Sequence, residues 1–103
     1  MESFSQRVFD LALEIPAGKV TTYGDLARAA GGGAQAARSI TYILSSHPNS
    51  AVIPFHRIVY AEGKVWLPEK YAKKRQALYR KEGIIVDERG VIINFEQVRY
   101  DFS

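Results

Sequence analysis

Residues 22–46 read TYGDLARAAGGGAQAARSITYILSS, and this stretch decides the fold that we expect. Thr22 is a typical N-cap residue, and it predicts a short helix over residues 23–30. The three glycines at 31–33 indicate a turn, and the pattern after them predicts a second helix over residues 34–46. Two short helices joined by a glycine turn, the second rich in small residues, are typical of a helix-turn-helix motif.

The remaining elements extend outward from this motif. In chain order, we expect a helix over 4–14 ended by Pro16 and Gly18, an extended piece at 20–21, an extended segment at 51–55, a β-hairpin from 58–60 to 64–66, a helix over 69–82 stopped by Gly83, and a small hairpin from 84–86 to 91–93. A helix-turn-helix motif followed by a β-hairpin is the outline of a winged helix. We therefore expect a single domain over residues 1–103, mainly α with short β-hairpins, of the winged helix-turn-helix class.

The composition excludes several classes of chemistry. The 103 residues contain no cysteine, which rules out disulfides, Fe–S clusters, thiolate zinc sites and thiol nucleophiles. Two histidines are a thin ligand set, so we expect no metal and no cofactor. The net charge of +3 favours a polyanionic partner only weakly, because a slightly basic soluble protein has the same balance.

The cellular location that we predict rests on the absence of membrane-spanning and signal-peptide patterns from the sequence. No apolar run approaches the roughly 20 residues of a membrane span, so no membrane partner is expected. The first residues do not form a signal-peptide pattern. We therefore expect a cytoplasmic protein, which would be associated with the nucleoid in a bacterium or lie in the nucleus of a eukaryote.

Four short patterns occur in order between residues 4 and 86. They are IPAGKVTTYGDLA at 15–27, AAR at 36–38, IPFHRI at 53–58 and EG at 82–83. At this spacing they resemble the O6-alkylguanine-DNA alkyltransferases (methylated-DNA–protein-cysteine methyltransferases), whose active-site motif reads Pro-Cys-His-Arg. The separation of Arg38 and Phe55 equals the separation of the matching arginine and the reactive cysteine in that family. Phe55 therefore occupies the position of the cysteine.

This replacement removes the chemistry of the family, because a benzyl side chain has no lone pair and no titratable proton with which to accept an alkyl group. Within the family the chain is most similar to the alkyltransferase-like proteins, which replace the cysteine, usually with tryptophan. The resemblance implies a non-enzymatic protein that docks its helix-turn-helix motif in the minor groove of double-stranded DNA. It implies that the protein flips O6-alkylguanine into a pocket and flags the lesion for nucleotide excision repair proteins. We also expect a monomer.

The resemblance implies a role for particular residues. Arg38 would fill the gap that the flipped nucleotide leaves in the base stack, and Tyr23 would crowd a phosphate and help the nucleotide rotate outward. The implied DNA-binding residues are Tyr23, Arg38, Ser39, Thr41 and Tyr42. The implied lesion pocket consists of Tyr23, Pro54, Phe55, His56, Val65 and Trp66. His56 and Glu82 match the pair that activates the family's cysteine, and without a thiol we expect them to form a structural hydrogen bond.

Each of these residues also has an ordinary structural interpretation. Arg38 could be a solvated surface arginine, Tyr23 a half-buried aromatic between helices, and Phe55 a core residue beside Pro54. The chain departs from the alkyltransferase-like proteins in the loop 67–69, which offers no arginine.

Two other functions remain open on the sequence alone. The protein could be an alkyltransferase-type enzyme that uses another nucleophile, in which case the alkyl group would appear on the protein. It could also be a helix-turn-helix transcription regulator, which would prefer one duplex sequence whether or not damage is present.

Overall fold

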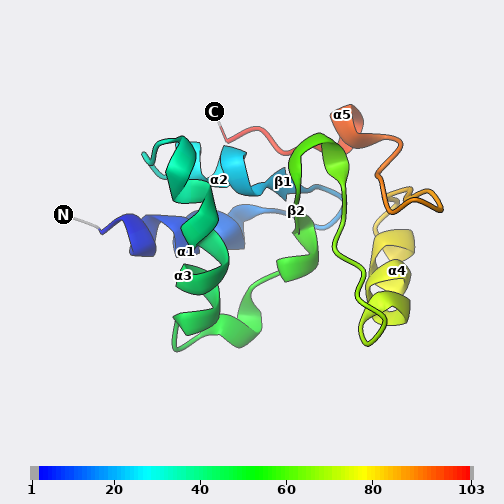
Figure 1. Cartoon of the computed structure of the whole chain (residues 1–103), viewed down its shortest axis with the longest axis horizontal. Helices are drawn as coiled ribbons and strands as arrows, with labels where there is room; N and C mark the ends of the chain where they lie inside the picture. Colours follow the sequence, from blue (N-terminus) through cyan, green and yellow to red (C-terminus); the bar gives the residue numbers. More distant parts are fainter. Residues whose placement is uncertain (1–2, 103) are drawn as a thin grey trace.

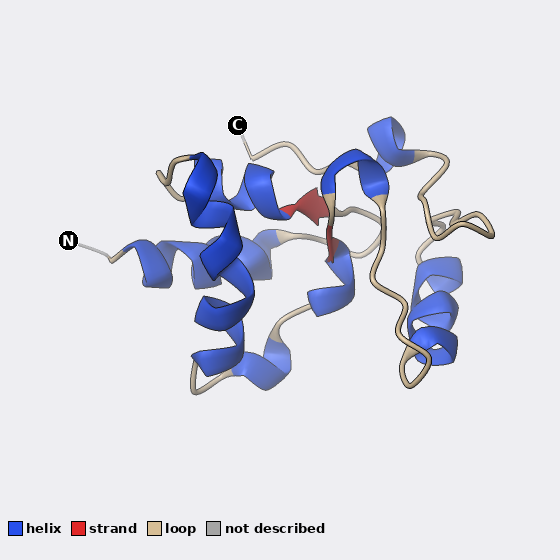
Figure 2. Cartoon of the chain, in the orientation of Figure 1, coloured by secondary structure: helices blue, strands red, loops and turns tan. Residues whose placement is uncertain are grey.

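The computed structural model describes residues 3–102, which form a mainly helical fold around a sheet of two short strands (Figure 1). The α-helices are α1 (Phe4–Glu14), α2 (Tyr23–Ala29), α3 (Ile40–Ser46), α4 (Ala72–Lys81) and α5 (Phe95–Val98). The strands are β1 (Thr21–Thr22) and β2 (Ile58–Val59), and short 3₁₀ helices form η1 (Ala34–Ser39), η2 (Ser50–Val52), η3 (Phe55–Arg57) and η4 (Ala61–Gly63) (Figure 2). Across residues 3–102, every helix is too short or too polar to cross a membrane.

The first half of the chain is a three-helix unit in which α1 packs against both α2 and α3. The Ser3 hydroxyl accepts a hydrogen bond from the backbone N–H of Gln6 at 3.1 Å, so α1 begins where the sequence predicts. The apolar residues of α1 then face inward at helical spacing. The buried residues of this first core are Val8, Phe9, Ala12, Ile15, Leu26, Ala27, Ala30, Ile40, Leu44, Ile53 and Ile58.

The sheet joins segments that are distant in sequence. Strands β1 and β2 run parallel, with Thr21 opposite Ile58 and Thr22 opposite Val59. The backbone N–H of Val20 donates to the carbonyl of Val98 at 2.9 Å, and the N–H of Tyr100 donates to Val20 at 2.7 Å, so the C-terminal segment also pairs here. A second core lies under α4, and its buried residues are Val20, Val59, Val65, Tyr79, Ile84, Ile92 and Val98.

The helix expected over residues 34–46 is divided in the structure. Its first part is the 3₁₀ helix η1, and only Ile40–Ser46 is α-helical. Gly33 precedes η1 and has no side chain with which to cap it, and the N–H of Ile40 bonds to Ala37 three residues back. Tightening of this kind is frequent at helix N-termini. The helix-turn-helix arrangement of α2 followed by η1 and α3 is retained.

The prediction that residues 51–55 are extended is wrong, because this segment contains parts of η2 and η3. Val52 and Ile53 close tight turns onto Asn49 and Ser50, at 3.2 Å in both cases. Within residues 3–102, the two strands pair with each other and neither pairs with this segment. The consequence is that the Phe55 motif lies on a turn and its successive side chains reach different neighbours.

The hairpin expected from 58–60 to 64–66 is also wrong. Tyr60 does bond to the carbonyl of Lys64 at 2.8 Å, but Lys64 then bridges Val91 and the N–H of Val65 donates to Gly90 at 2.8 Å. Burial of Val65 in the second core accounts for this divergence. Gly63 allows the turn, because its φ is +86° and a side chain there would meet the Phe95 ring at 3.0 Å.

The last part of the chain agrees more closely with expectation. Helix α4 begins three residues later than predicted, after a turn in which Tyr71 bonds to Pro68, and Gly83 ends it with a φ of +76°. The hairpin over 84–93 is present as one antiparallel bridge between Val86 and Ile92. The sequence did not indicate α5, a single turn of helix.

Candidate nucleic-acid interface

The exposed face of η1 and α3 borders a shallow hollow. This feature, which we call the helix hollow, has a volume of about 290 Å³ and is lined by Tyr23, Ala37, Arg38, Thr41 and Tyr60. The rings of Tyr23 and Tyr60 pack with their centroids 5.6 Å apart, which holds Tyr23 at the start of α2. The structure therefore brings together three of the residues that the sequence assigns to DNA binding, namely Tyr23, Arg38 and Thr41.

The other two predicted DNA-binding residues lie next to the helix hollow without lining it. Ser39 is exposed at the end of η1, and Tyr42 is 75% exposed on α3. Arg38 is exposed as well, and among residues 3–102 no carboxylate pairs with it. An unpaired guanidinium on an exposed helix is free to contact a phosphate or a base.

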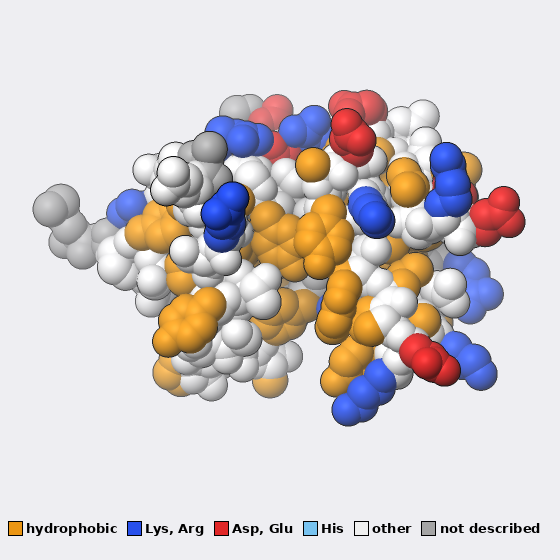
Figure 3. Space-filling model, in the orientation of Figure 1, with side chains coloured by type: hydrophobic (Ala, Val, Ile, Leu, Met, Phe, Trp, Pro, Cys, Tyr) orange, Lys and Arg blue, Asp and Glu red, His pale blue; other side chains and the backbone are white. Residues whose placement is uncertain are grey.

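A second cavity, which we call the pocket, lies between α3 and α4 and has a volume of about 600 Å³. Its lining residues are Ser45, Ile53, Phe55, His56, Trp66, Tyr71, Lys74, Arg75 and Leu78. Hydrophobic side chains gather along the notch between the α3 side and the α4 side of the molecule (Figure 3). The pocket is therefore open to solvent and mainly apolar.

The structure places the predicted pocket residues in four different surroundings. Phe55, His56 and Trp66 line the pocket. Tyr23 lines the helix hollow instead, and Val65 is buried in the second core because its segment pairs with Gly90. Pro54 is half-buried beside Phe55 and does not line the cavity.

Sequence reasoning missed the contribution of α4 and the turn before it. Tyr71, Lys74, Arg75 and Leu78 face the pocket at spacings of three, four and seven residues, which is one face of a helix. This periodicity could have identified the wall. The guanidinium carbon of Arg75 lies 5.0 Å from the centroid of the Trp66 ring, so a cation covers this aromatic side chain.

Helix α3 connects the two cavities. Thr41 lines the helix hollow and Ser45 lines the pocket, and these residues are one helical turn apart on the same face. The Ser45 hydroxyl donates to the Thr41 carbonyl at 2.7 Å. A ligand that follows this face of α3 can therefore reach both cavities.

The Phe55 motif lies on the turn at residues 53–58, which we call the motif turn. The carboxylate of Glu82 holds this turn in place. Its two oxygens accept hydrogen bonds from Arg57 at 2.9 and 3.0 Å, and Oε1 also accepts a hydrogen bond from the backbone N–H of Gly18 at 3.0 Å. His56 Nε2 lies 2.8 Å from the same carboxylate, as expected for the structural pair. Burial opposes ionisation of Glu82, but the bonds from Arg57, Gly18 and His56 outweigh it and lower its pKa to about 2.

A hydrogen bond from α4 also fixes the backbone of His56. The Tyr79 hydroxyl donates to the backbone carbonyl of His56, which ties α4 to η3. Burial raises the pKa of Tyr79 to about 12, so this hydroxyl remains a neutral donor at physiological pH. Arg57 also donates to the carbonyl of Ile15 at 3.0 Å. The motif turn is thus fixed from both α1 and α4.

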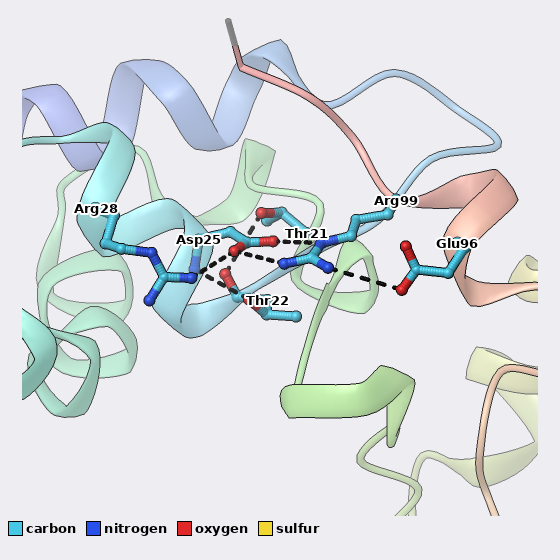
Figure 4. Close-up of polar contacts among 6 residues, drawn as sticks. All are labelled: Thr21, Thr22, Asp25, Arg28, Glu96 and Arg99. Carbon is cyan, nitrogen blue, oxygen red and sulfur yellow. Dashed lines mark hydrogen bonds and ion pairs between the residues drawn. The ribbon is translucent and has the colours of Figure 1, made fainter.

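A separate ionic cluster holds the start of α2 (Figure 4). Asp25 accepts hydrogen bonds from Arg99 at 2.8 and 2.9 Å and from Arg28 at 2.6 Å, and its own N–H donates to the Thr22 hydroxyl at 3.0 Å. The hydrogen bonds from Arg99 are the main reason that the pKa of Asp25 is lowered. Arg99 belongs to the C-terminal segment, so this segment positions the helix that presents Tyr23.

Residues 3–102 contain no cluster of three or more His, Asp or Glu side chains that could hold a metal ion. The two cavities instead offer exposed cations, aromatic rings and apolar side chains.

The chain matches the family model described as 6-O-methylguanine DNA methyltransferase, DNA binding domain, over residues 3–84. It belongs to this family. The resemblance inferred from the four sequence patterns is confirmed, and the matched range includes Phe55.

Relatives within the methyltransferase family resemble the chain over most of its length. It is 34% identical over 101 residues to the DNA base-flipping protein of Escherichia coli strain K12, covering 98% of this chain and 77% of that protein. It is 37% identical over 65 residues to alkyltransferase-like protein 1 of Schizosaccharomyces pombe, covering 63% of this chain and 59% of that protein. The crystal structure of S. pombe Atl1 in complex with damaged DNA containing O6-carboxymethylguanine matches with a TM-score of 0.73 and 27% identity, covering 98% of this chain and 99% of that one. The expected fold class is therefore confirmed.

Proposed function

We propose that this protein recognises O6-alkylguanine in double-stranded DNA by rotating the damaged nucleotide into the pocket, and that it transfers no alkyl group. The observation that carries the proposal is Phe55. This residue lines a cavity of about 600 Å³ at the position of the family's reactive cysteine, beside a His56–Glu82 pair that is still in hydrogen-bond contact. The pocket keeps its supporting structure and lacks the atom that would react.

Ser45 and His56, which line the pocket, are not arranged as an activated replacement for the cysteine. The Ser45 hydroxyl donates to the Thr41 carbonyl, and His56 Nε2 faces Glu82. A serine nucleophile needs a base within hydrogen-bond reach, and neither contact provides one. These contacts support binding over an alkyltransferase that uses another residue.

The helix hollow supports docking of a duplex along α3. We propose that Arg38 enters the base stack and that Tyr23 crowds the backbone of the flipped nucleotide, with α3 in the minor groove. Minor-groove readout is degenerate, which suits a protein that must find damage in any sequence. Flipping costs a few kcal/mol and costs least for a base that pairs badly, while burial of the alkyl group adds about 0.8 kcal/mol per CH₂. Both effects favour the lesion over normal guanine.

The relatives support the same function. One is named a DNA base-flipping protein, and Atl1 has been crystallised with DNA that contains O6-carboxymethylguanine. We propose that the complex acts as a flag for nucleotide excision repair proteins, because a lesion that is bound and left unrepaired still needs removal.

A fluorescence titration with two duplexes tests the proposal. The duplexes are identical except that one contains O6-methylguanine where the other contains guanine. We expect tighter binding to the damaged duplex in several unrelated sequence contexts. Equal affinity for the two duplexes, or a preference that follows the sequence and ignores the damage, would favour a transcription regulator and contradict the proposal.

A further inference from the structure

The α4 side of the pocket carries two cations and no acid. Lys74 and Arg75 line the cavity, and none of its nine lining residues is an aspartate or a glutamate. The carboxylate of Glu82, at the end of α4, is already bonded to Arg57, Gly18 and His56. The lining of this wall therefore carries a net positive formal charge.

Neither cation has a counterion in the described chain. The ion pairs found over residues 3–102 include neither Lys74 nor Arg75. Arg75 is half-buried, and its guanidinium rests over Trp66 at 5.0 Å, which restricts its position. A cation that is held in place without a counterion is well prepared to bind an anion.

Much of the remaining lining is apolar, although Ser45, His56 and Tyr71 also carry polar side-chain atoms. Ile53, Phe55 and Leu78 contribute hydrocarbon surface that suits a flat base and the first carbon of a substituent. A ligand that ends in a negative charge would match both parts of the cavity. A neutral ligand of the same size would match only the apolar part.

We propose that the pocket selects guanine adducts whose O6 substituent ends in an anion, such as a carboxymethyl group, over neutral substituents of equal size. Lys74 and Arg75 are the residues that determine this selectivity. The inference rests on the proposed function and extends it, since it names the class of lesion that is bound best. The alternative role for the two cations is contact with backbone phosphates, which every duplex offers equally.

Three duplexes that differ in one base test the proposal. They contain guanine, O6-carboxymethylguanine or O6-carbamoylmethylguanine, in which a neutral amide replaces the carboxylate with almost no change in shape. At fixed salt and pH 7.4, we expect the carboxymethyl duplex to bind about tenfold more tightly than the carbamoylmethyl duplex, as for one charge-assisted hydrogen bond. In the double variant Lys74→Gln and Arg75→Gln, this ratio should fall towards one.

A matched control is available on the same helix. Lys73 is exposed on α4 and does not line the pocket, so Lys73→Gln should leave the ratio unchanged. Circular dichroism and thermal unfolding of each variant check that the fold is retained.

The possible results separate this inference from the proposed function. Tight but equal binding of the two adducts would overturn the inference and leave the proposed function standing. An equal loss of affinity by the double variant for all three duplexes would assign the cations to phosphates and also overturn it. Failure of both adducts to bind more tightly than guanine would overturn the proposed function, and the inference with it.

Discussion

The helix hollow and the pocket both border α3, but they differ in how many separate segments of the chain line them. The helix hollow comes almost entirely from residues 23–41, a continuous motif, with Tyr60 added from elsewhere. The pocket takes its lining from α3, from the turn at 53–56, from Trp66 and from the segment 71–78. Hydrogen bonds that Glu82 and Tyr79 form with His56 tie two of these walls, the turn at 53–56 and α4, together.

This difference suggests a division of tasks. A surface that docks on any duplex needs only exposed cations on a short motif, whereas a pocket that reads a lesion needs walls from several segments in a fixed arrangement. Replacement of one pocket residue, such as cysteine by Phe55, can then remove chemistry without disturbing how the protein docks. Substitutions in each region can test whether docking at the helix hollow and lesion binding in the pocket are separable.

The largest effect is expected for Glu82→Gln. This substitution should lower the free energy of unfolding of the whole protein and thereby disrupt the pocket. The folded-state pKa of about 2 lies below the ordinary value of 4.5, so ionised Glu82 stabilises the fold above pH 4.5 and loses this effect as the pH falls towards 2. The shift corresponds to a stabilisation on the order of 3 kcal/mol at pH 7. Urea unfolding of wild type and variant should show that difference at pH 7 and less than half of it at pH 3.

Glu88→Gln is the control for this measurement, because Glu88 is exposed and lies in the turn of the last hairpin. It should change the free energy of unfolding by only a few tenths of a kcal/mol. A Glu82→Gln difference that did not depend on pH would show that the carboxylate charge is not what holds the turn.

Arg38→Ala should weaken lesion binding without changing stability, because Arg38 is exposed in the helix hollow. Loss of its stacking in the vacated base step should cost about 1–3 kcal/mol in binding to O6-methylguanine DNA. A base analogue that fluoresces when unstacked, placed at the lesion, should report less flipping. Lys73→Ala is the matched control, and it should weaken binding to damaged and normal DNA equally. An unchanged flipping signal in Arg38→Ala would return Arg38 to the role of a solvated surface residue.

Arg99→Gln should have the smallest effect, which should be confined to the helix hollow. Asp25 would lose its main partner, at a cost of at most about 1 kcal/mol in stability because Arg99 is partly exposed. Hydrogen exchange at the Asp25 amide, which bonds to Thr22, should become faster. Arg89→Gln, which breaks the exposed pair with Asp87, should leave this amide unchanged. Equal protection of the amide in wild type and Arg99→Gln would show that the C-terminal segment does not position α2.

The elements that sequence reasoning predicted well are those decided by local interactions. Helix α1 and the start of α2 have hydroxyl caps three residues before the N–H groups that they accept, so both signals lie within one turn. The hairpin at 58–66 was predicted wrongly because Lys64 and Val65 pair with residues 90–91, and a pairing so distant leaves no local pattern. The hydrogen bonds of Arg99 to Asp25 span 74 residues and were invisible for the same reason.

The same reasoning applies to the two cavities. Three residues of the helix hollow, Tyr23, Arg38 and Thr41, were predicted from one continuous motif and the family resemblance, whereas Ala37 and Tyr60 were not. In the pocket, the resemblance named Phe55, His56 and Trp66, which line it, but it named Val65 as well, which the second core buries. The wall from α4 was missed because it depends on how that helix packs against the motif turn.

The measurement that tests the account most directly is the mass of the protein after incubation with O6-methylguanine DNA. We expect wild type to bind the duplex, to gain no methyl group and to leave the lesion intact. Phe55→Cys should gain a methyl group slowly, because it places a thiol beside the His56–Glu82 pair, and this variant serves as the positive control. A methyl group on the wild-type protein, or unmodified guanine recovered from the DNA, would contradict the claim that this pocket reads the lesion without reacting with it.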